Sequence, residues 1–454
     1  MKEKKEIKLK YFGTDGFRGE YGNTLTDAHA EAIGRFLGIH YGDGADILIG
    51  MDTRWSSPIL ESALIKGITS AGGTAFRLGV CPTPAVSFIA KHGGVAAAVM
   101  ITASHNPASD NGIKLFDNSG EKLSDEIIAI CEKFIDEKDS ISKATIKEKT
   151  AVDDKKFVNV QHLIMRWEKE MISSADRLDG LKIGLDCANG ATYDTALRIF
   201  KALGAEVFTI GCDPDGKNIN LGVGSTHPEA LAMMVQEDGL DMGFAFDGDG
   251  DRCIAIDKDG RTIDGDGEMF ILAKAMKARG ELTDDKVVCT VMSNGGFIHS
   301  LEKLGIKCSI TAVGDRFVAE EMKVSGAALG GEQSGHIILQ KGGGNGIFTA
   351  IRLAELSKAA GKGLGELTED LTLRPQLARN INVKDKSSAM SAQKLLNAIK
   401  DARDEMGDQG RIILRPSGTE NLIRLMVEHE NPDKCKQYVD KLVKIIEEIS
   451  TEQE

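Results

Sequence analysis

The chain has 454 residues, of which 41% are hydrophobic and 28% charged, and its formal net charge is −13. This length and composition predict several globular domains of about 100–200 residues each and argue against a disordered chain. The negative charge argues against a general nucleic-acid binder, and an anionic ligand would need a local cluster of Arg and Lys.

The sequence carries no zinc-ribbon or thioredoxin motif, because no two of its eight cysteines have the C-x-x-C spacing. The charged residues 1–6 are not followed by an apolar stretch, so no signal peptide is predicted. No apolar run approaches the ~20 residues that span a bilayer. We therefore expect a cytoplasmic protein with free thiols that binds neither membranes nor nucleic acid.

The first third of the chain alternates strand and helix patterns. A Ser-Pro pair at 57–58, followed by apolar residues on a 3.6-residue period, predicts the start of a helix. The charged segment 137–154 has little pattern and is interpreted as the linker that ends a first domain, 1–154. The other elements expected here are strands at 46–50 and 96–101 and a helix at about 124–136.

The same alternation repeats twice in the middle of the chain, and this predicts parallel α/β sheets. We place a second domain at 155–258 and a third at 259–372. The expected strands are 182–186, 206–210, 242–246, 286–291 and one near Ile310, and the expected helices are 193–203, 228–237, 268–278 and 297–304.

The last ~80 residues differ, because two predicted strands follow each other across a short loop. This favours a small α+β domain at 373–454. The fold class predicted for the whole chain is α/β, with three similar mixed α/β domains followed by one α+β domain. The last expected elements are strands at 379–383, 411–414 and 422–428 and helices at 389–405 and 432–449.

An acidic loop at 247–252, Asp-Gly-Asp-Gly-Asp-Arg, follows the strand predicted at 242–246. It therefore lies at the carboxyl end of a strand, where open α/β sheets bind ligands. Its three carboxylates alternate with glycines and can meet on one hard cation, which suits Mg²⁺ or Ca²⁺ but not zinc. An EF-hand is excluded, because Arg252 and Lys258 occupy the positions that need Gly and Glu.

Ser104 ends an apolar strand and enters a turn at Asn106-Pro107, which would expose its hydroxyl at the sheet edge. The G-x-S-x-G elbow of serine hydrolases is absent, and the adjacent His105 is expected to point to the opposite face. A serine without a base can carry a phosphoryl group when a metal activates the transfer. Ser104 is thus a candidate carrier, and the alternative is an ordinary turn serine.

Two further segments carry groups suited to a sugar. Lys114 follows the Ser104 turn and would be a base if burial near other cations lowered its pKa; the alternative is a surface lysine. The loop 330–336 presents Glu332 and Ser334 as candidates to bind sugar hydroxyls and His336 as a candidate for proton transfer.

A polar loop between the two last predicted strands is a candidate phosphate cradle, with a plain hairpin turn as the alternative. It offers a guanidinium, hydroxyls and glycine-exposed N–H groups within five residues. Its candidate ligands are Arg415, Ser417, Gly418 and Thr419, with Arg424 on the following strand.

These segments, in this order and over nearly the whole chain, resemble the motifs of the α-D-phosphohexomutase family. Gln333 stands where members that act on glucose or mannose phosphates typically carry Met, which resembles the subgroup that acts on glucosamine phosphates. Phe17 and Trp55 depart from the usual residues, but no motif residue is missing. The matching segments are 11–19, 102–107, 247–252, 332–336 and 415–419.

The resemblance implies four domains around a central cleft, in an isomerase of amino sugar metabolism. It would interconvert glucosamine 6-phosphate and glucosamine 1-phosphate through phospho-Ser104 and a 1,6-bisphosphate. One Mg²⁺ per chain, a homodimer and a substrate phosphate held by loop 415–419 are also implied. The metal ligands would be Ser104, Asp247, Asp249 and Asp251; Lys114 and His336 would transfer protons; and Arg18 and Arg252 would hold the transferring phosphoryl group.

Two alternatives remain open at this point. The same chemistry would act on glucose or mannose phosphates in an otherwise identical site. A non-catalytic sugar-phosphate sensor would instead use phosphorylation of Ser104 as a signal, although such a sensor has no need of Lys114 and the three aspartates.

Overall fold

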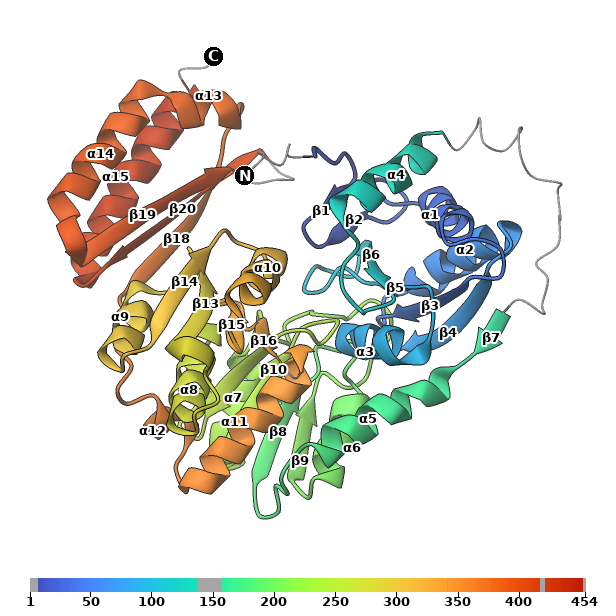
Figure 1. Ribbon diagram of the computed structural model, residues 1–454. Coiled ribbons are helices and arrows are strands. Elements are labelled where there is room, and N and C mark those ends of the chain that lie inside the picture. The colour runs from blue at the N-terminus through green and yellow to red at the C-terminus, as the bar shows by residue number, and fades with distance from the viewer. Residues whose placement is uncertain (1–6, 138–156, 341, 417–420, 452–454) are drawn as a thin grey trace. The chain divides into compact units, whose positions relative to one another are not determined.

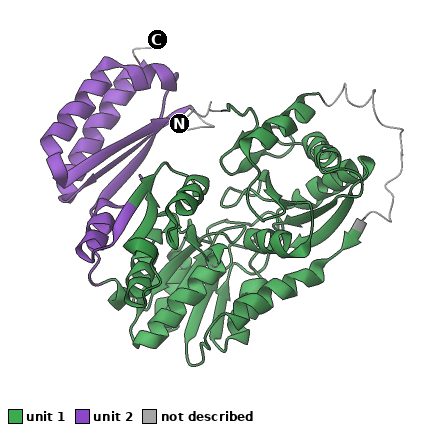
Figure 2. Ribbon diagram, viewed as in Figure 1, with its two compact units in different colours: residues 1–290, 309–368 green, residues 291–308, 369–454 purple. Residues whose placement is uncertain are grey.

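The computed structural model describes residues 7–137, 157–340, 342–416 and 421–451 (Figure 1). The chain divides into two compact units, one formed by 1–290 and 309–368 and the other by 291–308 and 369–454 (Figure 2). Each unit has a buried apolar core of its own. The predicted linker at 137–154 lies almost wholly outside the described residues.

The first sheet of unit 1 mixes parallel and antiparallel strands. Buried residues of helices α1 (Asp27–His40), α2 (Ser57–Ser70) and α4 (Asp125–Asp136) share one core on one face of the sheet, and α3 (Thr83–Gly93) packs on the other (Figure 1). The strand order is β1 (Phe12–Gly13), β2 (Gly16–Glu20), β6 (Asp110–Asp117), β5 (Ala97–Ile101), β3 (Asp46–Met51), β4 (Thr74–Val80) and β7 (Phe157–Asn159).

The second sheet of unit 1 has a parallel core, β10-β8-β9, and two antiparallel strands beside β10. Its strands are β12 (Thr262–Ile263), β11 (Cys253–Asp257), β10 (Met242–Phe246), β8 (Lys182–Asp186) and β9 (Glu206–Ile210), and the helices that accompany them are α5 (Ile164–Ser173), α6 (Thr195–Ala202) and α7 (Glu229–Glu237).

The third sheet also combines a parallel pair, β13 with β15, and antiparallel pairs. Its order is β14 (Lys307–Thr311), β13 (Lys286–Thr290), β15 (Leu329–Gly331), β16 (Ile337–Leu339) and β17 (Gly343–Gly344), and the helices are α8 (Gly265–Ala278), α10 (Asp315–Ser325), α11 (Gly346–Ala360) and α12 (Leu364–Leu367).

Unit 2 is built on one antiparallel sheet, β18 (Gln376–Asn382), β20 (Leu422–His429) and β19 (Gly410–Pro416). Apolar residues of this sheet share a core with α14 (Gln393–Met406) and α15 (Pro432–Thr451). The short helix α13 (Lys386–Ser391) precedes α14, and α9 (Gly295–Lys303) belongs to the same unit.

The predicted fold class is confirmed, since three mixed α/β sheets precede an α+β unit. Strands 182–186, 206–210 and 242–246 have the predicted bounds. The expected parallel pairing is found in part of each of the three sheets, and after β5 and after β10 the chain turns back and returns as an antiparallel strand. The helix predicted at 389–405 is interrupted at Ala392, whose backbone is extended. No helix within the described ranges is long and apolar enough to cross a bilayer.

Candidate active site

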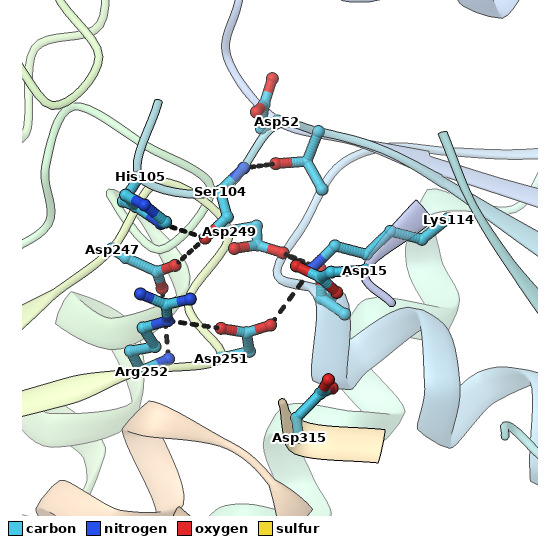
Figure 3. A network of polar contacts seen from close by, with 12 residues as sticks. Asp15, Asp52, Ser104, His105, Lys114, Asp247, Asp249, Asp251, Arg252 and Asp315 are labelled. Atoms are coloured by element: carbon cyan, nitrogen blue, oxygen red, sulfur yellow. Dashed lines mark hydrogen bonds and ion pairs between the residues drawn. The ribbon is translucent and has the colours of Figure 1, made fainter. Parts of the chain in front are cut away.

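The loop after β5 and the loop after β10 meet in unit 1. Ser104 is fully buried, and its Oγ donates a hydrogen bond to Asp247 Oδ2 at 2.5 Å (Figure 3). A Cβ at Gly248 would collide with the carbonyl oxygen of Ser104, so glycine is needed for this close approach. The structure therefore brings the predicted carrier and the predicted metal loop together.

Asp247, Asp249 and Asp251 are all buried, and one oxygen of each lies within 4.8 Å of the others. Burial and the two neighbouring carboxylates raise the pKa of Asp247 well above its ordinary value. Asp249 Oδ1 is buried without a hydrogen-bond partner among the residues that the structure describes. An orphaned oxygen beside two other carboxylates fits a hard divalent cation, which would satisfy the oxygen and offset the repulsion.

Lys114 reaches this cluster from β6, where it lies opposite Met100 of β5. The ammonium is 2% exposed and donates to Asp249 Oδ2 at 2.8 Å and to Asp251 Oδ2 at 3.2 Å. Burial favours the neutral amine, but the carboxylates of Asp15, Asp249 and Asp251 outweigh it and raise the pKa of Lys114 well above its ordinary value. Burial excludes the alternative of a surface lysine, and the lowered pKa that a base role would require is not found in this arrangement.

His105 also lies at the site, with Nδ1 3.3 Å from Ser104 Oγ, so the prediction that it points away is wrong. The reason is the backbone of Ser104, whose φ of 53° breaks the alternation of side chains that an extended chain would have. Burial and the charges of Arg252 and Arg18 lower the pKa of His105 to about 4. Its imidazole is therefore neutral at neutral pH.

His336 approaches the metal loop from the turn between β15 and β16. It is 7% exposed, and its Nδ1 lies 3.5 Å from Asp251 Oδ1. Burial alone would lower its pKa, but Asp251 outweighs burial and raises the pKa to about 9. His336 is therefore protonated at neutral pH, which suits a proton donor.

Several cations surround the cluster, as a phosphate site on a −13 chain requires. Arg252 donates its backbone N–H to Asp247 Oδ1 at 3.2 Å, and its partly buried guanidinium has a raised pKa because Asp247 and Asp251 are near. Arg18 pairs with Asp15. Lys122 bridges Asp15 Oδ1 and Asp315 Oδ2, each at 2.7 Å.

The sugar-loop candidates lie next to the metal loop, because Cys253 donates its N–H to the Gly335 carbonyl at 3.0 Å. Glu332 Oε1 accepts the N–H of Gly314 at 3.0 Å, at the start of α10. Ser334 is exposed. Gln333 Nε2 donates to Asp264 Oδ2 at 3.2 Å, so its amide supports the loop.

The predicted phosphate cradle belongs to unit 2. Arg415 of β19 and Arg424 of β20 are directly paired in the antiparallel register, which places their side chains on the same face of that sheet. Ser417, Gly418 and Thr419 lie outside the described residues.

Some residues at the site were missed by the sequence interpretation. Thr83 donates its hydroxyl to Asp249 Oδ2 at 2.5 Å and its N–H to the Asp249 carbonyl at 2.9 Å. Thr83 stands between Pro82 and Pro84 at the start of α3. This local pattern indicates a helix N-terminus, but it cannot indicate a partner that is 166 residues away in the sequence. Asp15 lies inside the recognised segment 11–19, yet no role was assigned to it.

Family models of phosphoglucomutase/phosphomannomutase match four successive stretches of the chain: α/β/α domain I at 9–142, domain II at 155–260, domain III at 264–374 and the C-terminal domain at 379–445. The chain therefore belongs to the phosphoglucomutase/phosphomannomutase family, and it is a phosphohexomutase, an isomerase.

Relatives with high sequence identity to the chain are phosphoglucosamine mutases, one kind of phosphohexomutase. Phosphoglucosamine mutase of Geobacillus kaustophilus is 46% identical over 442 residues, and that of Bacillus subtilis is 45% identical over 443. Each alignment covers 96% of this chain and 98% of the relative.

Solved structures share the fold. A phosphoglucomutase/phosphomannomutase family protein from Burkholderia thailandensis has a TM-score of 0.77 at 23% identity, covering 97% of this chain and 98% of its own. The Aspergillus fumigatus N-acetylphosphoglucosamine mutase, solved with GlcNAc-6P and magnesium, has a TM-score of 0.68 at 16% identity, covering 98% of this chain and 96% of its own.

Proposed function

We propose that this phosphohexomutase interconverts glucosamine 6-phosphate and glucosamine 1-phosphate through phosphorylated Ser104. The observation that carries the proposal is the hydrogen bond from Ser104 to Asp247, at the centre of three buried carboxylates, Lys114 and His336. The choice of an amino sugar is supported by the phosphoglucosamine mutases that are 44–46% identical to the chain.

Ser104, Asp247, Asp249 and Asp251 would hold one Mg²⁺, because their oxygens converge and one of them has no other partner among the described residues. Bound there, the cation would neutralise charge on the transferring phosphoryl group. We propose Arg18 and Arg252 as the residues that grip the same phosphoryl group.

Transfer breaks the bond between phosphorus and Ser104 Oγ and forms one to the 1-hydroxyl of glucosamine 6-phosphate, whose proton passes to the Ser104 alkoxide that the transfer releases. The resulting 1,6-bisphosphate returns its 6-phosphoryl group to Ser104. Lys114 and His336 are proposed to move these protons, and both lie on the carboxylate cluster. Glu332 and Ser334 would hold the sugar hydroxyls, and the phosphate that is not reacting would be held by Arg415, Ser417, Gly418, Thr419 and Arg424.

Replacing Ser104 tests the carrier role. Ser104→Ala should abolish interconversion and remove the phosphorylated peptide from the mass spectrum, since no other oxygen occupies that position. Ser109→Ala, in the same loop but exposed, is the matched control and should retain activity. Turnover by the Ser104→Ala protein at the native rate would contradict the proposal.

Substrate choice is tested by kcat/KM on glucosamine, glucose and mannose 6-phosphates. We expect kcat/KM on the amino sugar to exceed that on the other two by at least about tenfold, because a hydrogen bond to a charged group contributes about 1.5 kcal/mol or more. A higher kcat/KM on glucose or mannose phosphate would contradict glucosamine specificity while leaving the mutase chemistry intact. Added substrate should also remove the phosphate from Ser104, which a sensor protein would not allow.

We further propose a cytoplasmic homodimer with domains at 1–154, 155–258, 259–372 and 373–454. The matches of the family models to four successive stretches support four domains. Sedimentation equilibrium on the purified chain tests the dimer, and a monomer mass at micromolar concentration would contradict it.

A further inference from the structure

The main chain of Ser104 adopts a left-handed conformation, with φ at 53°. Residues with a Cβ rarely occupy this region, because the Cβ crowds the following carbonyl oxygen. They persist there when the surroundings hold the peptide units on both sides. At Ser104 the preceding unit is held by its own N–H, which donates to Thr102 Oγ1 at 2.9 Å.

The following unit is held first by Arg54, which comes just after β3 and is 1% exposed. Its Nη2 donates to the carbonyl oxygens of Ser104 at 2.9 Å and Asn106 at 2.8 Å. Its Nη1 donates to the carbonyls of Pro107 and Asp110, the latter at 2.9 Å. One guanidinium therefore binds four carbonyl oxygens of the loop at 104–110.

Asp52 fixes the orientation of this guanidinium. Its Oδ2 accepts Arg54 Nε at 2.8 Å, and its Oδ1 accepts the hydroxyl of Ser57 at 2.9 Å and the backbone N–H of Arg54 at 3.0 Å. Both members of the ion pair are buried. The charge of Arg54 is thus balanced, and its remaining donors are directed at the loop.

A second donor comes from the next sheet. Asn220, in the loop after β9, is 8% exposed and donates through Nδ2 to the carbonyls of Ser104 at 2.9 Å and Asn106 at 3.0 Å. Its own N–H donates to the Ala188 carbonyl at 2.8 Å, which ties it to the loop after β8. The Ser104 carbonyl therefore accepts one hydrogen bond from a loop after β3, in the first sheet, and one from a loop after β9, in the second.

We propose that Arg54 and Asn220 are positioning residues that clamp the main chain of Ser104 in its left-handed conformation and so keep Oγ aimed at the aspartate cluster. The inference rests on the proposed role of Ser104 as the phosphoryl carrier. Neither side chain bonds Oγ; both act through the carbonyl oxygen. A carrier must return to one position both to give and to recover its phosphoryl group, and fixing both adjacent peptide units achieves this.

The first test uses Asn220→Gly, because Asn220 itself has a φ of 59° and glycine accepts this backbone without strain. Asn218→Gly is the matched control: it lies in the same loop, and among the described residues its side-chain amide bonds the backbone of Asp213 and Asp215. We expect Asn220→Gly to lower kcat roughly 10–100-fold, as a misplaced reacting group does, with KM within about twofold of the native value. Asn218→Gly should change neither.

An unchanged kcat in Asn220→Gly, or a raised KM with kcat unchanged, would overturn the clamp.

Arg54→Lys is a second test of the clamp, since lysine keeps the charge opposite Asp52 but cannot reach four carbonyl oxygens. We expect it to lose at least as much kcat as Asn220→Gly, and full activity of Arg54→Lys would also contradict the proposal.

A second measurement does not depend on catalysis. In the clamped protein Ser104→Gly should melt no lower than Ser104→Ala, because glycine adopts the left-handed backbone freely. When Asn220→Gly is added to both variants, Ser104→Gly should melt below Ser104→Ala. The loop can then relax out of the left-handed conformation, and glycine loses more backbone entropy on folding. The same order in both backgrounds would overturn the clamp even if Ser104→Ala is inactive. A reversal together with an active Ser104→Ala would instead retain the clamp and reject the carrier role.

Discussion

At the scale of single residues, the site is a set of charges held in place both by other charged groups and by neutral hydrogen-bonding groups. The Lys114 ammonium neutralises part of the aspartate cluster, while the Thr83 hydroxyl and the Asn220 amide orient an aspartate and the Ser104 backbone. Hydrogen bonds to charged groups are stronger than neutral ones, and these are buried away from competing water. The geometry of the site therefore depends on residues that have no part in the chemistry.

Asp186 gives a test of stability against pH at this scale. Burial raises its pKa to about 6, despite hydrogen bonds from the N–H groups of Gly224 at 2.6 Å and Ala188 at 2.9 Å. Between pH 4 and pH 6 the folded carboxyl therefore holds a proton that the unfolded one has released, so stability falls as pH rises. The full effect is on the order of 3 kcal/mol.

The melting temperature measured from pH 4 to pH 7 checks this. The melting temperature of the wild type minus that of Asp186→Asn should fall as the pH rises to about 6 and then stay constant. A difference that is flat, or that rises with pH, would show that this carboxyl is ionised throughout the range.

Sequence patterns indicated the candidate reacting residues that the structure brings together, but not the residues that hold them. Ser104 and the aspartates stand in short motifs at strand ends, where position in the chain already implies position in the sheet. Asn220 lies 116 residues from the Ser104 carbonyl it binds, and no local pattern encodes such a partner. His105 was misplaced because its direction depends on the unusual φ of its neighbour.

At the scale of elements, loops at strand ends build the site by touching one another. The turn at 332–336 meets the start of β11. In this turn Gly335 has a φ of 86°, and a Cβ at Gly335 would collide with the carbonyl oxygen of Cys253 in β11. Sequence patterns missed β6, which returns antiparallel after the Ser104 loop. Its apolar pattern is interrupted by the site residue Lys114, so the usual strand pattern is weak.

Gly335→Ala should therefore both destabilise the protein and lower its kcat. We expect a loss of more than about 1 kcal/mol of unfolding free energy, since left-handed backbone and a steric clash act together. Because the displaced turn carries Glu332 and His336, kcat should fall as well. Gly343→Ala is the matched control: it shares a positive φ of 64° but has open space around its Cβ. Equal denaturation midpoints for the two variants would rule out the close approach as the cause.

At the scale of the whole molecule, the metal candidates all lie in unit 1, whereas Arg415 and Arg424 lie in unit 2. Mg²⁺ that binds only the folded aspartate cluster stabilises that unit by mass action. Chelation of the ion should therefore stop phosphoryl transfer and lower the melting temperature of unit 1, with that of unit 2 unchanged. Calorimetry with and without a chelator measures this, and equal shifts in both units would exclude a site confined to unit 1.

Unit 2 is assembled from two separate stretches of chain, and one buried side chain joins them. Glu428 of β20 is fully buried and accepts the N–H of Gly295, at the start of α9, from 133 residues away. On the ribosome Gly295 is made 133 residues before its acceptor, and at about 5–20 residues per second the interval is about 7–27 s. Asn294 caps the N–H of Gly296 locally, but the N–H of Gly295 must wait for β20, the last strand among the described residues, before its acceptor exists.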